Sequence, residues 1–208
     1  MADGRDIACW DNHALECEAD KRKPFEFKKD ADGHYFWLRE EFLKLDDVVK
    51  CLDIGCGPGY WIKLFEGAEY SAFDQSPGMI TLAKKQLKEN GLLDTVKSLV
   101  LGNARKLEDH YQPGNFDLVF TSSVLQHNRH DPDKREIVEG IHYILREGGY
   151  YLCTENTYRE DNHPDPAKRS DYTDGYTFTP EGWEKWMREL GFELLGFNGK
   201  SEYLYRKI

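Results

Sequence analysis

The sequence VVKCLDIGCGPGY at Val48–Tyr60 decides the fold. It begins with an apolar run that is typical of a buried strand and continues into three glycines at alternate positions, Gly55, Gly57 and Gly59. Because glycine has no Cβ, such a turn allows a ligand to approach the backbone closely. We predict a helix directly after the turn, whose unpaired N–H groups and positive dipole end would face the same ligand.

The spacing of these glycines helps to choose the ligand. A dinucleotide-binding turn has the pattern G-x-G-x-x-G, which would place its third glycine at position 60. Tyr60 stands there instead, and an aromatic side chain would crowd a pyrophosphate. The strand also ends with the carboxylate of Asp53, so a cationic, nucleoside-bearing ligand such as S-adenosylmethionine fits better. A tight turn without any ligand is the alternative reading.

The heptapeptide DIGCGPG at Asp53–Gly59 resembles the first motif of the class I S-adenosylmethionine-dependent methyltransferases. The resemblance covers residues 48–155 and implies that S-adenosylmethionine is the cofactor. It further implies that Asp53, Gly55, Cys56, Gly57 and Gly59 bind it. Cys56 meets the need for a small side chain within the turn.

Composition narrows the functional class. The chain has 208 residues, which suits one domain, and a formal net charge of −10, which disfavours nucleic acid as a partner. No apolar run approaches the roughly 20 residues that span a bilayer. The polar start at residues 1–11 gives no secretory signal, so we expect a cytoplasmic protein. Five cysteines without C-x-x-C spacing indicate neither a disulfide framework nor a zinc site.

Predicted strands and helices alternate along most of the chain, which favours a doubly wound, mostly parallel sheet of the Rossmann-like kind. The Asn198-Gly199 turn predicts an antiparallel hairpin at the C-terminus. Together these features match the seven-stranded order of the resembled family. We predict one methyltransferase domain with four segments: an N-terminal helical cap (1–47), a cofactor-binding core (48–155), a substrate lid (156–179) and a C-terminal helix and hairpin (180–208).

Five further residues extend the expected cofactor site. Asp74 lies 19 residues after Gly55 at a strand end, where an acidic side chain can accept two hydrogen bonds from a ribose. In the resembled family, an Asn or Asp followed by a small residue meets the adenine ring, and here Asn103-Ala104 has that place. Gln75 and Met79 are the remaining candidates, although core packing explains Met79 equally well.

The segment FDLVFTSSVLQH at Phe116–His127 resembles the fourth motif of the family. The resemblance implies that Thr121 and Ser122 lie beside the methionine part of the cofactor. It also places His127 near the transferred methyl group, where an imidazole could remove a proton from the acceptor. A histidine that only packs is an equally good reading. His127, His130, Asp131 and Asp133 lack metal-ligand spacing, so we expect no metal.

The acceptor is expected near the end of the fifth predicted strand, where Glu155, Asn156 and Tyr158 are candidate contacts. The long segment 156–179 after them could form a lid or a plain surface excursion. The hydrophobic positions of His34–Leu45 suggest a helix that either caps the open end of the sheet or covers its core.

The sequence thus predicts a class I S-adenosylmethionine-dependent methyltransferase that acts on an oxygen or nitrogen atom of a small molecule. Three alternatives remain open: a non-catalytic subunit that binds the cofactor, a methyltransferase acting on protein or RNA, and an NAD-dependent oxidoreductase. The Tyr60 spacing disfavours the last of these. The acceptor and the oligomeric state cannot be read from the sequence.

Overall fold

The computed structural model describes residues 7–19, 34–128, 131–155 and 180–208. Seven strands form one sheet in the order β3-β2-β1-β4-β5-β7-β6. Neighbouring strands from β3 to β5 are parallel, whereas β7 runs antiparallel to both β5 and β6. The strands are β1 (Lys50–Ile54), β2 (Glu69–Asp74), β3 (Val96–Leu101), β4 (Phe116–Ser122), β5 (Leu145–Thr154), β6 (Phe192–Phe197) and β7 (Glu202–Lys207). The predicted mostly parallel sheet with a terminal antiparallel hairpin is confirmed.

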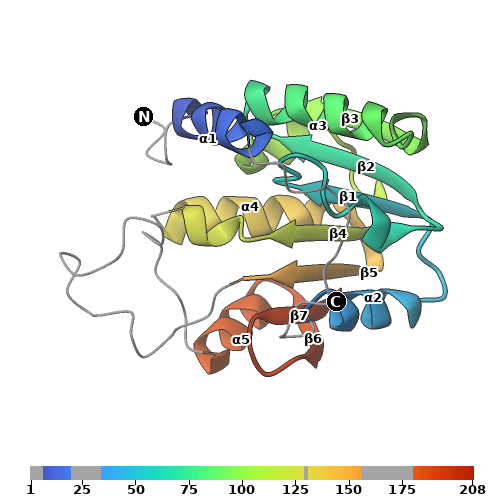
Figure 1. The fold of residues 1–208 in the computed structure, drawn as a ribbon. Coiled ribbons are helices and arrows are strands. Elements are labelled where there is room, and N and C mark those ends of the chain that lie inside the picture. The colour runs from blue at the N-terminus through green and yellow to red at the C-terminus, as the bar shows by residue number, and fades with distance from the viewer. Residues whose placement is uncertain (1–6, 20–33, 129–130, 156–179) are drawn as a thin grey trace.

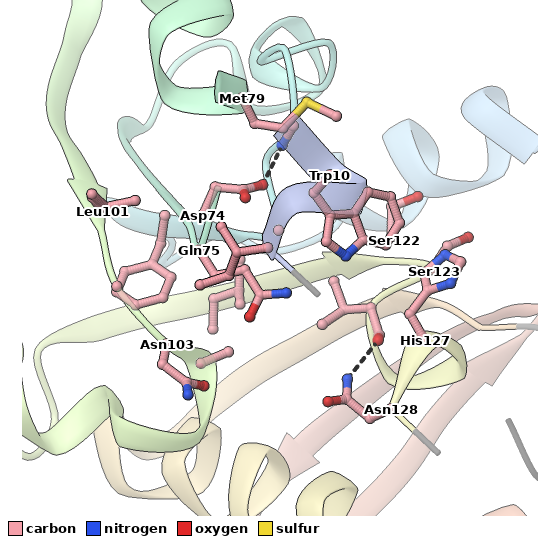
Figure 2. A pocket seen from close by; sticks show the side chains of 18 of the residues that line it. Trp10, Asp74, Gln75, Met79, Leu101, Asn103, Ser122, Ser123, His127 and Asn128 are labelled. Atoms are coloured by element: carbon pink, nitrogen blue, oxygen red, sulfur yellow. Dashed lines mark hydrogen bonds between the residues drawn. The ribbon is translucent and has the colours of Figure 1, made fainter. Parts of the chain in front are cut away.

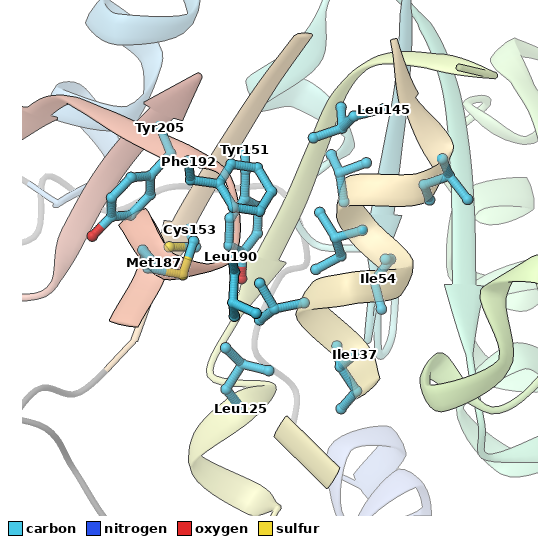
Figure 3. Close-up of a cluster of buried hydrophobic side chains, with 14 of the residues drawn as sticks. Ile54, Leu125, Ile137, Leu145, Tyr151, Cys153, Met187, Leu190, Phe192 and Tyr205 are labelled. Atoms are coloured by element: carbon cyan, nitrogen blue, oxygen red, sulfur yellow. The ribbon is translucent and has the colours of Figure 1, made fainter. Parts of the chain in front are cut away.

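The helices cover both faces of this sheet (Figure 1). One buried cluster joins α4 and α5 to one face, and a second joins α2 and α3 to the other. Figure 3 shows the first cluster, which includes Ile137 of α4, Met187 of α5, and Tyr151 and Cys153 of β5. The helices are α1 (Ile7–Ala19), α2 (His34–Leu43), α3 (Pro77–Glu89), α4 (Asp131–Ile144) and α5 (Pro180–Glu189).

The order of the strands fixes where a ligand can bind. From β1 the chain continues through β2 and β3 on one side, and then returns to place β4 on the other side of β1. Parallel sheets bind ligands at the carboxyl ends of the strands where the order reverses, because the connecting loops diverge there and leave a crevice. The glycine turn after β1 lies at this point.

The helix predicted directly after the glycine turn is wrong. The structure has only a short 3₁₀ helix there, at Ile62–Phe65. Gly67 has φ +105° and β2 begins at Glu69, so residues 60–68 must hold both the helix and its connections to the turn and to the next strand. The prediction that a helix dipole faces the ligand therefore fails with it.

The N-terminal cap is formed by a different helix from the one predicted. Within the described residues, α2 lies against the 3₁₀ helix and β7, and its Leu38 and Phe42 are buried in the core. The alternative reading of this segment, a helix that covers the core, is the correct one. Instead, α1 packs on α3 at the opposite end of the sheet, as Figure 1 shows at the top of the molecule.

Both ends of α3 follow from ordinary capping. The side chain of Ser76 accepts a hydrogen bond from the Met79 amide (3.0 Å), and Pro77 occupies the first turn of α3. Gly91 follows this helix with φ +68°.

No helix among the described residues is long and apolar enough to cross a membrane.

Candidate cofactor and active site

A cavity of about 640 Å³ lies at the carboxyl ends of the parallel strands. Residues at the ends of β1, β2, β3 and β4 line it, and α1 closes it from above. This volume falls within the range of sites for small molecules and cofactors, roughly 300–1,000 Å³. The structure brings the following predicted site residues to its wall: Gly55, Gly57, Asp74, Gln75, Met79, Asn103, Ala104, Ser122 and His127.

The glycine turn forms the floor of the cavity. The amides of Gly55 and Cys56 donate to the carbonyl of Phe73 (2.8 and 3.1 Å), which holds the turn against β2. Gly55 has φ +69°, and a Cβ on it would lie 2.5 Å from a methyl group of Val124. Gly57 has φ +51°, and a Cβ there would meet no atom within 4 Å. The turn therefore leaves open space in front of Gly57.

Asp74 ties the turn to the start of α3. One carboxylate oxygen accepts from the Gly57 amide and the other from the Ser76 amide, each at 2.9 Å. The side chain is buried yet lines the cavity. Burial raises the pKa of this carboxyl, and the amide donors oppose that rise. Each carboxylate oxygen can accept more than one hydrogen bond, so Asp74 can also accept from a ligand.

The cavity has two ends, which Figure 2 shows. Asn103 lies at the first end, where its side chain accepts from the Arg105 amide (3.0 Å) and thereby shapes the turn after β3. Arg105 is neutralised by ion pairs with Asp133 (3.1 Å) and Glu136 (2.7 Å). Figure 2 places these labelled side chains around the first end: Leu101, Asp74, Gln75 and Asn103.

At the second end His127 faces Trp10 of α1. The two rings meet edge-on, with centroids 4.8 Å apart and planes at 78°. Such edge-to-face contacts hold an aromatic pair in a defined orientation. The short 3₁₀ turn Leu125–His127 carries the histidine, and the amide of His127 donates to the Val124 carbonyl (3.2 Å). The structure thus places the His127 ring at the cavity wall beneath the N-terminal helix.

α1 is anchored through Asp11. The carboxylate of Asp11 accepts from the Ser76 hydroxyl (2.5 Å) and from the Gly78 amide (2.8 Å). These two donors lower the pKa of Asp11. Ala14 of α1 packs with Met79 and Leu82 of α3 in a small buried cluster. The hydrogen bonds of Asp11 and the packing of Ala14 fix the position of α1 over the cavity, and with it the position of Trp10.

Several predicted site residues do not line the cavity. Cys56 is buried in the core, and Gly59 lies against the side chain of Leu87. The hydroxyl of Thr121 lies within hydrogen-bond distance of Tyr151 (2.8 Å), on the buried side of β4. Glu155 is buried beneath the turn that follows β4 and, among the described residues, is also absent from the cavity wall. Asn156, Tyr158 and the proposed lid lie outside the described residues.

Asp53 is likewise absent from the wall, because the alternation of β1 turns it towards the core. One of its carboxylate oxygens accepts from the Tyr70 hydroxyl (2.6 Å), and the other has no hydrogen-bond partner among the described residues. Burial raises the pKa of Asp53 to about 7, against the opposing effect of the tyrosine hydrogen bond. This carboxyl is therefore poised to take up a proton on folding.

The stability of the protein should accordingly depend on pH through Asp53. Between its unfolded pKa of 3.8 and its folded pKa of about 7, the folded protein binds the extra proton, so this contribution to stability falls as pH rises. From pH 5 to pH 8 the wild type should lose about 2–3 kcal/mol of unfolding free energy relative to Asp53→Asn. Urea denaturation of both proteins measures this difference. Parallel pH dependence in the two would contradict it.

Sequence reasoning missed several cavity residues. Ser123 and Asn128 flank positions that the fourth motif identifies, but nothing in their residue types marks them. Leu101 is an ordinary strand residue whose exposure, 49%, becomes meaningful only next to the cavity. His13 belongs to α1, whose position over the site could not be read from local patterns. Only the packing of α1 over the strand ends reveals the contribution of His13.

The residues present fit an adenosyl sulfonium cofactor. The open space before Gly57 is what a cofactor that lies along the glycine turn requires. Asp74 is a carboxylate with unused acceptor capacity at the strand next to this turn, in the place suited to a ribose diol. Asn103 presents an amide at the first end of the cavity, where it can both donate and accept.

Comparisons with known proteins agree with this fit. Residues 52–153 match the family model described as a methyltransferase domain. An uncharacterized methyltransferase of Emericella nidulans is 28% identical over 185 residues, covering 78% of this chain and 63% of the relative. A demethylmenaquinone methyltransferase of Lactococcus lactis is 29% identical over 132 residues, covering 60% and 50%. The chain thus spans about half to two thirds of the length of these relatives.

A solved structure shares the fold across nearly all of both chains. The PH0226 protein from Pyrococcus horikoshii superimposes with a TM-score of 0.70 at 19% identity, covering 93% of this chain and 99% of the other. At that identity the likeness shows the fold alone. The family match over the strands that build the cavity, together with the motif at its floor, supports a class I S-adenosylmethionine-dependent methyltransferase.

Proposed function

We propose that this protein transfers a methyl group from S-adenosylmethionine to an oxygen or nitrogen atom of a small molecule. The observation that carries the proposal is the open space before Gly57, which adjoins Asp74 where the strand order reverses. A small-molecule acceptor is supported by the size of the cavity and by the quinone named in the Lactococcus relative. The net charge of −10 disfavours RNA as the acceptor. We further propose that the protein acts in the cytoplasm.

In this proposal the chain contributes mainly by alignment. The cofactor supplies an electrophilic methyl group when it is bound. Asp74 and the glycine turn hold the sugar, Asn103 contacts the base, and Ser122 and Ser123 border the methionine end. Holding two reactants in line can lower a barrier by about 7–11 kcal/mol. Trp10 of α1 shields the second end of the cavity from water.

We assign His127 the role of general base for the acceptor. Its imidazole stands at the cavity wall, and the edge of Trp10 restricts the orientation of its ring. An imidazole titrates near neutral pH and can take a proton from a hydroxyl or an amine as the nucleophile attacks. Asn156 and Tyr158 remain proposed acceptor contacts, and 156–179 remains a proposed lid. The buried carboxylate of Glu155 is better suited to support the site than to touch the acceptor.

The proposal is tested by binding followed by product mass. In calorimetry the wild type should bind S-adenosylhomocysteine and not NAD. Gly57→Leu should weaken that binding about 100-fold because its side chain fills the open space, whereas folding should lose only about 1–2 kcal/mol from the positive φ. A mass increase of one methyl group in a panel of hydroxylated and amino compounds then identifies the acceptor.

The same experiments separate the alternatives. Binding of NAD in place of S-adenosylhomocysteine would show an oxidoreductase and overturn the proposal. Cofactor binding without any methylated product, from small molecules, protein or RNA, would identify a non-catalytic subunit. If methylated product formed only on protein or RNA, the acceptor would be a macromolecule and not a small molecule.

A further inference from the structure

The turn between β4 and α4 builds one wall of the cavity from an unusual backbone. Ser122, Ser123, Val124, His127 and Asn128 all line the cavity from this turn. Ser123 has φ +59°, and it is the one non-glycine residue with positive φ in the described part of the chain. A left-handed conformation costs a serine roughly 1–2 kcal/mol. Such a conformation persists only where surrounding contacts impose it.

Those contacts come from the end of β5. The amide of Ser123 donates to the carbonyl of Thr154 (2.8 Å), which continues the pairing of β4 with β5 beyond the strand. The next residue, Glu155, is buried with 3% of its surface exposed. Its carboxylate accepts from the amides of Val124 and Leu125 (3.1 Å each) and Gln126 (3.3 Å), and from the Thr121 hydroxyl (3.2 Å). One side chain thus receives three donors from a single turn and a fourth from Thr121 of β4.

From this arrangement we infer that Glu155 is a positioning residue that holds the 122–128 turn in the shape that presents His127 to the cavity. The inference deepens the proposed function and rests on it where it concerns turnover. Glu155 acts through the turn and, among the described residues, does not itself line the cavity. Its role differs from the acceptor contact that its place at a strand end suggested.

The chemistry of the contacts supports this role. Three successive amides that converge on one point need an acceptor with several lone pairs, and a carboxylate supplies about four. Hydrogen bonds to a charged acceptor are about twice as strong as neutral ones. A glutamine in the same place would offer one oxygen and direct an NH₂ group at amide donors. Burial raises the pKa of Glu155 to about 7, while the amides and the Thr121 hydroxyl hold it down.

A matched control lies on the neighbouring strand. Glu202 of β7 is equally buried, at 1% exposure, and pairs with Thr154 in the sheet. Its carboxylate accepts from the side chains of Ser201 (3.0 Å) and Asn198 within the C-terminal hairpin. Replacing Glu202 with glutamine therefore removes a buried carboxylate of the same sheet and keeps the carboxylate of Glu155 that accepts from the 122–128 turn.

The experiment compares Glu155→Gln with Glu202→Gln through the histidine signals in NMR. His127→Gln identifies the His127 signal, and His142, whose ring packs on Phe192 away from the cavity, serves as an internal reference. Glu155→Gln should shift or broaden the His127 signal and leave the His142 signal in place. Glu202→Gln should move neither. The His127 signal is read without ligand, so it reports on the contacts between Glu155 and the 122–128 turn even if the proposed cofactor does not bind.

Kinetics give a second readout once an acceptor is known. Glu155→Gln should lower kcat about tenfold or more. Affinity for S-adenosylhomocysteine should fall by a smaller factor, because Asp74 and Asn103 are untouched and only the Ser122 and Ser123 border of the methionine end belongs to the loosened turn. A His127 signal that does not move in Glu155→Gln would overturn the inference. It would also be overturned if both glutamine variants lost the same thermal stability and kept the wild-type kcat. If Glu155→Gln fails to fold, Thr121→Val can be used instead, because it removes one hydrogen-bond donor to Glu155. A His127 signal that does not move in Thr121→Val would overturn the inference as well.

Discussion

Replacing Asp74 with alanine is expected to abolish measurable cofactor binding. The carboxylate bonds the amides of Gly57 and Ser76, and it lines the cavity where the ribose is proposed to lie. Alanine removes the proposed ligand contact and leaves two amides beneath the glycine turn without their acceptor. Each loss costs about 1–3 kcal/mol, so affinity should fall by at least about 100-fold. Calorimetry with S-adenosylhomocysteine measures the change directly.

Asp74→Asn is the control for this prediction. Asparagine keeps the shape of the side chain and one acceptor oxygen, so the turn retains part of its support while the charge is lost. Its affinity should lie between those of the wild type and the alanine variant. An Asp74→Ala protein that folds normally and binds the cofactor with wild-type affinity would show that the ligand is held elsewhere.

Replacing His127 with alanine is expected to lower turnover by about 10²–10⁴-fold, the usual contribution of a positioned general base. The reason is that the acceptor would lose the imidazole that takes its proton. Cofactor affinity should change little, because Asp74 and Asn103 lie away from the second end of the cavity (Figure 2). Product mass in single-turnover experiments with an identified acceptor measures the rate.

A packing role for His127 predicts a different result. His127→Phe keeps an aromatic ring against Trp10, with which the histidine makes its edge-on contact. If the ring only packs, the phenylalanine variant should retain turnover that the alanine variant loses. If the imidazole takes the proton, both variants should be slow. Wild-type turnover in His127→Ala would remove the histidine as the base.

Much of the sheet could be predicted because its strands carry local signals. The apolar run before Gly55 and the Asn198-Gly199 turn each specify structure within a few residues, and β1 and the C-terminal hairpin lie where they predict. The segment between Gly59 and β2 was predicted wrongly. Its residues are compatible with a longer helix, but the structure forms only a short 3₁₀ helix between the turn and β2.

The candidate site likewise contains residues whose place could be predicted from the sequence and residues whose place could not. Gly57 and Asp74 are marked by their spacing from a strand end, and the structure places both at the cavity. Asp53 and Thr121 belong to the same motifs, but the alternation of side chains along a strand turns them into the core. Trp10 and Leu101 carry no local mark, because only the folded structure brings α1 and the end of β3 to the same cavity.

By itself the sequence determined the class of fold, the glycine turn and the carboxylate of Asp74 after the next strand. It could do so because strand alternation and turn chemistry depend on near neighbours in the chain. The tertiary structure decided which helix covers the cavity and what Glu155 does. Those outcomes depend on contacts such as that of Asp11 with Ser76 and that of Glu155 with Val124, whose partners lie 65 and 31 residues apart. Such contacts form only when the packed core brings distant segments together.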